Sequence, residues 1–148
     1  MAAKAHLEVT LDTLLESVDL AEGMIQRVAE AAGFDESEVH KLGMAVREGV
    51  VNAYNYGNQQ DRRKKIHLAV EFESQTMIVH ILDEGAGFEL ADVPDPLAEE
   101  NLLRTSGRGL FLMKAFMDDF VVRRGPTGGA ELVMSKKLPP RFSGNGST

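Results

Sequence analysis

The sequence contains no cysteine, so disulfides, thiolate zinc sites and a thiol nucleophile are all excluded. Basic residues are also scarce: 16 Lys and Arg stand against 23 Asp and Glu, a formal net charge of -7. This balance argues against general nucleic-acid binding, which requires a basic surface. No apolar run approaches the roughly 20 residues of a membrane span, and the N-terminus lacks a signal-peptide pattern. We therefore expect a cytoplasmic protein that contacts neither nucleic acid nor membrane directly.

The 148 residues are enough for one domain with a sizeable core. No repeat or linker divides the chain, so residues 1–148 are expected to form a single domain with a frayed tail from about residue 140. The hydrophobic periods predict, in order, a strand near 6–10, helices at 12–33 and 35–57, a hairpin of 66–72 with 77–83, a loop at 89–106, a helix from 107, and a hairpin of 120–123 with 130–134. This order predicts an α+β fold, a two-layer sandwich of a mostly antiparallel sheet with helices on one face.

Five residues are expected to define the helix ends, and Gly33 is the one that ends the first helix. Asp12 is predicted to cap the first helix. Asp35 and Glu38 resemble a capping box at the start of the second helix. Gly57 is predicted to end that helix as a left-handed cap.

Asp83 closes an alternating apolar strand and is followed by Gly85 and Gly87. In the predicted hairpin Ile66 lies opposite Asp83, so the carboxylate ends a core-facing row and needs a hydrogen-bond donor. The glycines allow another group to approach the backbone closely, and a nucleobase amino group would fit beside this acceptor. A capped turn at a strand end explains the same residues.

Glu48 and Asn52 lie four residues apart on the second predicted helix and therefore share a face, away from its main apolar stripe. Asn55 extends this polar row by another turn. An amide oxygen is a suitable ligand for magnesium, and a carboxylate one turn away can position or deprotonate a hydroxyl. A solvated helix surface is the alternative interpretation.

Residues 105–109, with the sequence TSGRG, precede a strongly apolar helix. The N-terminus of a helix presents unpaired N–H groups, and glycines let phosphate oxygens reach them. A glycine-rich helix start with a hydroxyl cap is the alternative. The P-loop pattern is absent, and this G-x-G does not follow a strand in a βαβ unit, so neither of those nucleotide sites is indicated.

Taken in order, Glu48-x-x-x-Asn52, Asp83-x-Gly85-x-Gly87 and Gly107-x-Gly109 resemble the N, G1 and G2 boxes of the GHKL (Bergerat-fold) ATPases. Within that superfamily the chain is most similar to the stand-alone anti-sigma-factor serine kinases of bacterial partner-switching systems. The stretches that carry this resemblance are EGVVNA at 48–53, PDP at 94–96, SGRGLFLM at 106–113 and FMDD at 116–119. The resemblance covers about residues 7–138.

The resemblance implies the Bergerat ATPase fold, ATP and Mg²⁺ as cofactors, and a set of residue roles. Asp83 would accept a hydrogen bond from the adenine amino group. Asn52 would hold the Mg²⁺ that bridges the phosphates, and Glu48 would act on the attacking hydroxyl. The other implied nucleotide contacts are Gly85 and Gly87 around the adenine, and Arg104, Ser106, Gly107, Arg108 and Gly109 at the phosphates, next to an ATP lid at 89–106. For Arg104 and Arg108 a solvated position in the lid is the alternative.

Kinases of this group phosphorylate a serine of a small anti-anti-sigma (STAS-domain) protein, bind a sigma factor and are commonly homodimers, so the resemblance implies the same partners here. Two positions depart from the family pattern. Tyr56 stands where histidine is common, and Ala130 stands where threonine is common. The resemblance therefore implies that a hydroxyl near the adenine is missing.

Three functions follow from these residues. The first is an ATP-dependent anti-sigma-factor serine kinase. The second is an ATP-binding regulatory module that controls a non-sigma partner with little or no kinase activity. The third, a detached histidine-kinase catalytic domain, is disfavoured because no dimerisation helices with a phosphoacceptor histidine precede the boxes. Glu48 favours the kinase over the second function, because a pure binder needs no base.

Overall fold

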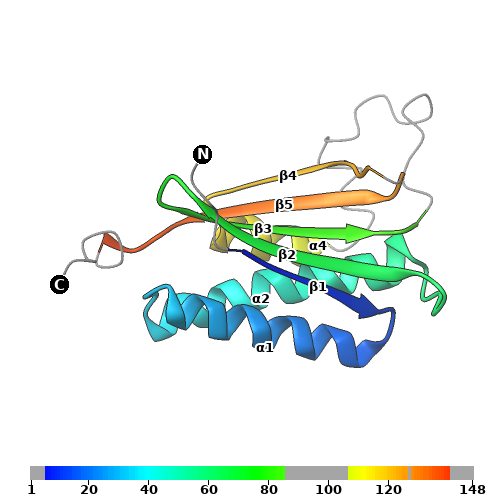
Figure 1. Cartoon of the computed structure of the whole chain (residues 1–148), viewed down its shortest axis with the longest axis horizontal. Helices are drawn as coiled ribbons and strands as arrows, with labels where there is room; N and C mark the ends of the chain where they lie inside the picture. The colour runs from blue at the N-terminus through cyan, green and yellow to red at the C-terminus, as the bar shows by residue number, and fades with distance from the viewer. Residues whose placement is uncertain (1–5, 86–106, 127, 141–148) are drawn as a thin grey trace.

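The structure, a computed structural model, describes residues 6–85, 107–126 and 128–140. The elements in these ranges are β1 (His6–Asp12), α1 (Leu15–Ala31), α2 (Glu36–Asn52), η1 (Ala53–Gly57), β2 (Lys65–Glu73), β3 (Thr76–Asp83), α4 (Gly107–Phe116), β4 (Asp119–Arg124) and β5 (Ala130–Lys137). The strands form one sheet in the order β1-β2-β3-β5-β4, with antiparallel neighbours throughout. Helices α1 and α2 run along one face of the sheet (Figure 1). The predicted α+β sandwich is confirmed.

The hairpin of β2 and β3 has the predicted register, with Ile66 paired to Asp83. Its turn is formed by Ser74 and Gln75, whose φ angles of 55° and 61° are both positive. Two consecutive positive φ angles are typical of the type I′ turn, whose twist matches that of the flanking strands. The register therefore continues without a slip to the end of β3, where it fixes the position of the Asp83 carboxylate.

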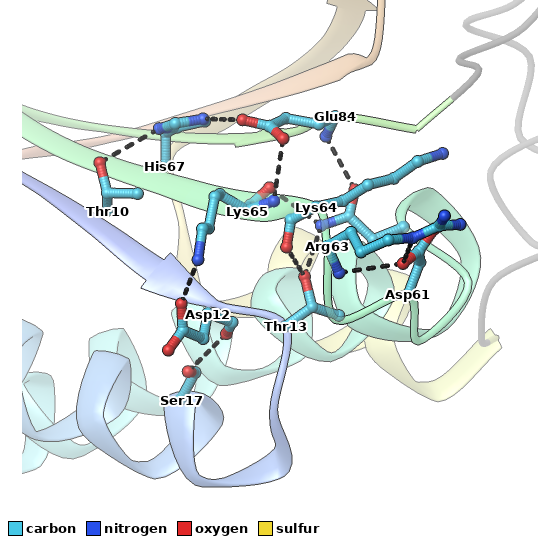
Figure 2. A network of polar contacts seen from close by, with 11 residues as sticks. Thr10, Asp12, Thr13, Ser17, Asp61, Arg63, Lys64, Lys65, His67 and Glu84 are labelled. Atoms are coloured by element: carbon cyan, nitrogen blue, oxygen red, sulfur yellow. Dashed lines mark hydrogen bonds and ion pairs between the residues drawn. The ribbon is translucent and has the colours of Figure 1, made fainter.

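The helix ends agree with the predictions only in part. The backbone N–H of Glu38 donates to Asp35 Oδ1 at 2.8 Å, so Asp35 caps α2 as predicted. The prediction for α1 is wrong, because its N-cap is Leu14 and Asp12 still belongs to β1. As the last residue of that strand, Asp12 directs its carboxylate toward the Lys65 ammonium on β2 (Figure 2).

The core lies between the sheet and the helices, and it includes Met113 of α4 and Met117, which follows that helix directly. The largest fully buried apolar side chains are Ile25, Leu42, Val46, Val50, Ile66, Leu68, Val70, Met77, Val79, Ile81 and Met134. Burying a side chain of this size stabilises the fold by about 1.5–3 kcal/mol. Asn58 is the one polar side chain among the largest fully buried residues of the described chain.

The C-terminal end of α2 differs from the prediction. The helix continues into η1, a π-helical turn in which the N–H of Asn58 donates to the carbonyl of Ala53 at 2.8 Å. The left-handed backbone predicted at Gly57 is found instead at Gln59 and Gln60, with φ angles of 53° and 61°. Single π turns inside helices occur frequently at functional sites. This one brings the end of the helix to the end of β3.

None of the helices in the described ranges combines the length and the apolar character that a membrane span would require.

Candidate functional site

Asp83 is the last residue of β3, and it is buried, with 7% of its surface exposed. Its Oδ1 atom accepts the backbone N–H of Gly85 at 3.0 Å and that of Ala130 at 3.1 Å. Both hydrogen bonds that the described residues make to this carboxylate therefore end on Oδ1. The carboxylate is held in one orientation, and its Oδ2 atom is left to accept from another donor.

Three glycines surround this carboxylate. A Cβ atom on Gly57 would lie 2.1 Å from Asp83 Oδ2, and one on Gly129 would lie 2.7 Å from Asp83 Oδ1. A Cβ atom on Gly85 would lie 1.8 Å from the carbonyl oxygen of Gly57. No side chain larger than hydrogen fits at these distances, so the backbone itself forms the walls. We call Asp83 with Gly57, Gly85 and Gly129 the Asp83 cradle.

Burial raises the pKa of the Asp83 carboxyl above its ordinary value. The N–H groups of Ala130 and Gly85 and the charge of Lys64 act in the opposite direction but do not cancel the effect of burial on this pKa. The ionised carboxylate is therefore costly in this position, and a further donor would stabilise it. An amino group on a flat ligand would supply such a donor.

Asn58 lies directly behind the Asp83 cradle and was missed in the sequence. Its Nδ2 donates to Thr13 Oγ1 at 2.8 Å and to the Lys65 carbonyl at 2.9 Å. Its Oδ1 accepts the backbone N–H of Glu84 at 2.8 Å. The amide thus connects the turn after β1, the start of β2 and the residue that follows Asp83.

The Glu84 side chain binds the segment after Asp83 to β2, on the face of the sheet opposite to the Asp83 side chain. Its carboxylate accepts the backbone N–H of Lys65 at 3.0 Å and lies 2.7 Å from His67 Nε2 (Figure 2). The hydrogen bond to His67, followed by that from Lys65, lowers the pKa of the Glu84 carboxyl. The segment after Asp83 is therefore held from both sides, by Asn58 and by β2.

Asn52 lies between two close contacts of the helical segment with the sheet, and Glu48 lies directly before the first of them. A Cβ atom on Gly49 would lie 2.7 Å from Ile81 Cδ1, so α2 touches β3 next to Glu48. At the other end, Gly57 touches Asp83, as described above. We call Glu48 and Asn52 the α2 polar row. The helical segment that carries this row therefore contacts β3 at Gly49 and, beyond the row, at Gly57.

Asn52 does not face bulk solvent. Its Oδ1 atom is buried and has no hydrogen-bond partner in the described part of the chain. An unpaired buried oxygen costs about 1–3 kcal/mol, and a cation would remove that cost by accepting it as a ligand. Among the described residues no group of three or more His, Asp or Glu side chains could hold a metal ion. The unpaired Asn52 oxygen fits a cation such as Mg²⁺, which takes few protein ligands and keeps several waters.

The other members of the predicted row differ from Asn52. Glu48 is half-buried, and no hydrogen bond or ion pair joins its carboxylate to the described residues, so it is available to a substrate. Asn55 lies in η1, after the end of α2, and its Oδ1 accepts from Gln60 Nε2 at 2.9 Å. Four residues apart, Glu48 and Asn52 project from the same face of α2.

The remaining predicted residues fall into two groups. Gly87, Arg104 and Ser106, with the predicted lid at 89–106, lie outside the described residues. Gly107, Arg108 and Gly109 form the first turn of α4, so the predicted helix start is confirmed. Of the two departures from the family pattern, Tyr56 is exposed and Ala130 donates its N–H to Asp83. Position 130 thus lies at the carboxylate, where its methyl group offers no hydroxyl.

The sequence profile of the histidine kinase-like ATPase domain matches residues 11–136, most of this chain. Together with the antiparallel sheet, its helical layer and the Asp83 cradle, this match defines the class of protein. The chain belongs to the histidine kinase-like ATPase domain family.

Two relatives show which kinds of protein within this family the chain is similar to. The chain is 28% identical over 139 residues to the serine-protein kinase RsbW of Oceanobacillus iheyensis, an alignment that covers 90% of this chain and 87% of that protein. It is 30% identical over 103 residues to the anti-sigma F factor of Bacillus subtilis, with coverage of 68% and 70%.

A solved structure supports the fold. The crystal structure of the RsbU and RsbW domains of Rv1364c from Mycobacterium tuberculosis superimposes with a TM-score of 0.66 at 20% identity, covering 95% of this chain. This chain spans 35% of the length of that larger one.

Proposed function

We propose that this chain is an ATP-dependent serine kinase of the anti-sigma type, which phosphorylates a serine of an anti-anti-sigma (STAS-domain) protein and sequesters a sigma factor. The similarity to a serine-protein kinase over 90% of the chain and to an anti-sigma F factor over 68% supports this activity. The observation that carries it is the Asp83 cradle, in which the buried carboxylate has glycine walls and keeps Oδ2 without a hydrogen bond from the described residues.

In this proposal Asp83 recognises the adenine. The exocyclic amino group donates to Oδ2, while Oδ1 remains fixed by the N–H groups of Gly85 and Ala130. The glycine walls let the flat base reach the backbone. Guanine carries a carbonyl oxygen at the same position, which would face the carboxylate as a second acceptor. The cradle therefore favours ATP over GTP.

The α2 polar row would serve the phosphates and the attacking serine. Bound Mg²⁺ would offset the negative charge of the phosphates. Asn52 would supply one oxygen ligand from its unpaired Oδ1. Glu48 would accept the proton of the serine hydroxyl as its oxygen bonds to the γ-phosphorus and the bond to the bridging oxygen breaks, releasing ADP. The first turn of α4 and the predicted residues Arg104 and Ser106 would contact the phosphates.

The test combines binding with identification of the substrate. The purified chain is titrated with ATP-Mg²⁺ and GTP-Mg²⁺ in a calorimeter, then used to capture proteins from the source cell with and without ATP-Mg²⁺. The proposal expects ATP binding and a small captured protein whose serine becomes phosphorylated, located by mass spectrometry. ATP binding without phosphoryl transfer to any captured protein would favour the regulatory module instead. A chain that binds no nucleotide would contradict both functions.

Oligomeric state is a separate part of the proposal. We expect a homodimer in solution, because the kinases that the sequence resembles are commonly homodimers. Light scattering at several protein concentrations measures the mass directly. A monomer at every concentration would contradict this part and leave the kinase activity unaffected.

A further inference from the structure

Asn58 has no place in the three sequence boxes, yet its side chain makes three hydrogen bonds, one of them to the residue that follows Asp83. We infer that Asn58 is a positioning residue, which orients the Asp83 carboxylate and thereby sets both the affinity for ATP and the preference for adenine over guanine. The inference rests on the proposed function, because it concerns how that nucleotide is recognised.

Asn58 is fully buried, and its side-chain amide is fully used. Both Nδ2 hydrogens have acceptors, Thr13 Oγ1 at 2.8 Å and the Lys65 carbonyl at 2.9 Å, while Oδ1 accepts from Glu84 N at 2.8 Å. A buried amide that pairs every donor and its acceptor has one stable orientation. It therefore acts as a fixed point between β1, β2 and β3.

The contact with Glu84 transmits this orientation to Asp83. The N–H of Glu84 belongs to the peptide group that begins at the Asp83 carbonyl carbon, and a peptide group is planar. A hydrogen bond to that N–H therefore fixes the rotation of the backbone on the C-terminal side of Asp83. The neighbouring Gly57 acts on the side chain itself, because its backbone lies against Asp83 Oδ2. The adjacent pair Gly57 and Asn58 thus determines the backbone and the carboxylate together.

A second set of hydrogen bonds, through Thr13, holds Asn58 itself in place. Thr13 is buried, accepts from Asn58, and donates its own hydroxyl to the Lys64 carbonyl at 2.6 Å. The bonds run in one direction, from amide to hydroxyl to carbonyl, an arrangement in which each bond strengthens the next. Figure 2 shows Thr13 and Lys64 joined in this way, with Glu84 across β2.

The residue type follows from these contacts. Aspartate at position 58 would set a carboxylate against the Lys65 carbonyl and could not donate to it. Alanine would leave the buried N–H of Glu84 and the carbonyl of Lys65 without side-chain partners. Asparagine supplies two donors and one acceptor from a single short side chain.

The test separates positioning from stability by comparing Asn58→Ala with Ser17→Ala. Ser17 is buried and donates to the Asp12 carbonyl at 2.6 Å, so its replacement also removes a buried side-chain hydrogen bond, but one that does not involve Asp83 or Glu84. For each variant, calorimetry gives the dissociation constants of ATP and GTP, and urea unfolding gives the stability. Wild-type protein is measured in the same series.

The inference expects Asn58→Ala to bind ATP about tenfold or more weakly, since a small misplacement of a recognising group has effects of this size. The ratio of GTP to ATP dissociation constants should fall as well, whereas Ser17→Ala should keep the wild-type ratio despite its lower stability. Unchanged ATP affinity or an unchanged ratio in Asn58→Ala would overturn the inference, because a purely structural brace would alter stability alone.

Two further results are distinguishable. If wild-type protein binds no ATP, the proposed function fails and the inference fails with it. If Asn58→Ala does not fold, Asn58→Ser is measured in the same way. A folded Asn58→Ser variant with the wild-type ratio of GTP to ATP dissociation constants would overturn the inference, and a reduced ratio would support it.

Discussion

The Asp83 cradle and the α2 polar row differ in how their polar atoms are partnered. In the cradle, Oδ1 of Asp83 has two backbone donors and the adjoining Asn58 amide is fully paired. In the row, Asn52 Oδ1 is buried without a partner, and the Glu48 carboxylate has none among the described residues. One region is thus built from fixed backbone contacts, and the other from side chains with free bonding capacity.

This difference suits two different tasks. A recognition site gains affinity when its donors and acceptors are already oriented, because little freedom is then lost on binding. A site for phosphoryl transfer must instead direct unpaired groups at a metal ion and a reacting hydroxyl. We therefore expect substitutions in the cradle to change nucleotide affinity, and substitutions in the row to change the rate of transfer.

The largest effect is expected at Glu48. Glu48→Ala should lower serine phosphorylation by about 10²–10⁴-fold while ATP affinity stays unchanged, because a general base acts on the chemical step alone. Single-turnover phosphorylation and calorimetry measure the two quantities. Glu30→Ala, which removes an exposed glutamate on α1, is the matched control and should alter neither. If Glu48→Ala phosphorylated serine as fast as the wild type, Glu48 would not be the general base. The contrast between the two regions would then be contradicted as well.

The next largest effect is expected at Gly57. Gly57→Ala places a methyl group 2.1 Å from Asp83 Oδ2, so the carboxylate or the π turn must shift. Overpacking of this kind costs about 1–3 kcal/mol of stability and should weaken ATP binding at the same time. Gly23→Ala on α1 is the matched control, since no atom lies within 4 Å of its added Cβ. That control should stabilise the helix by about 1 kcal/mol. Equal effects in the two variants, by urea unfolding and calorimetry, would show that the cradle tolerates a side chain.

Asp83→Asn should separate affinity from stability. The asparagine Oδ1 can still accept from Gly85 and Ala130, but its amide nitrogen would then face the adenine amino group, donor against donor. We expect a loss of about 1–3 kcal/mol in ATP binding free energy. The free energy of unfolding should stay equal or rise, because the variant no longer buries a carboxylate of raised pKa. Asp119→Asn, with the same charge change at an exposed site on β4, is the control. If Asp83→Asn kept the full affinity for ATP, Asp83 would be only a turn cap at the end of β3.

The smallest expected effect is a dependence of stability on pH. Between the ordinary carboxyl pKa and the raised pKa of folded Asp83, the folded chain binds more protons than the unfolded chain. The contribution of Asp83 to the free energy of unfolding should therefore fall as pH rises through this window, by at most about 1.4 kcal/mol per pH unit. Glu84, whose pKa is lowered, contributes with the opposite sign, so its stabilisation is lost as pH falls.

The comparison of wild type with Asp83→Asn isolates the first of these contributions. Urea unfolding at several pH values measures the difference between the two proteins. That difference should move against the wild type as pH rises, and a flat difference would show that burial does not raise the pKa of Asp83.

The sequence predicted those parts of the molecule that local periodicity controls. Alternation with a period of two specifies which residues of a strand face the core, so the pairing of Ile66 with Asp83 followed directly. The four-residue spacing of Glu48 and Asn52 likewise specified a shared helix face. It could not show that Asn52 Oδ1 is buried, because burial depends on what the rest of the chain places over that face.

The failures share one physical cause, which is contact between distant segments. Asn58 follows a predicted helix end, where asparagine is common in turns, but its burial depends on Thr13, 45 residues away. Asp12 has the residue type of a helix cap, but it is the last residue of β1 and its carboxylate pairs with Lys65. The insertion of β5 between β3 and β4 has no local signal, since both predicted hairpins are compatible with several strand orders.

Because η1, between Asn52 and Asn58, is a π turn, the site depends on the number of residues in this segment. Deleting one residue from η1 would allow an ordinary α-helical turn in which every backbone group is still paired. A π turn is wider than an α turn, so its loss would draw the Gly57 backbone away from the Asp83 carboxylate. Homologous chains that keep this architecture should therefore vary in composition here more readily than in length.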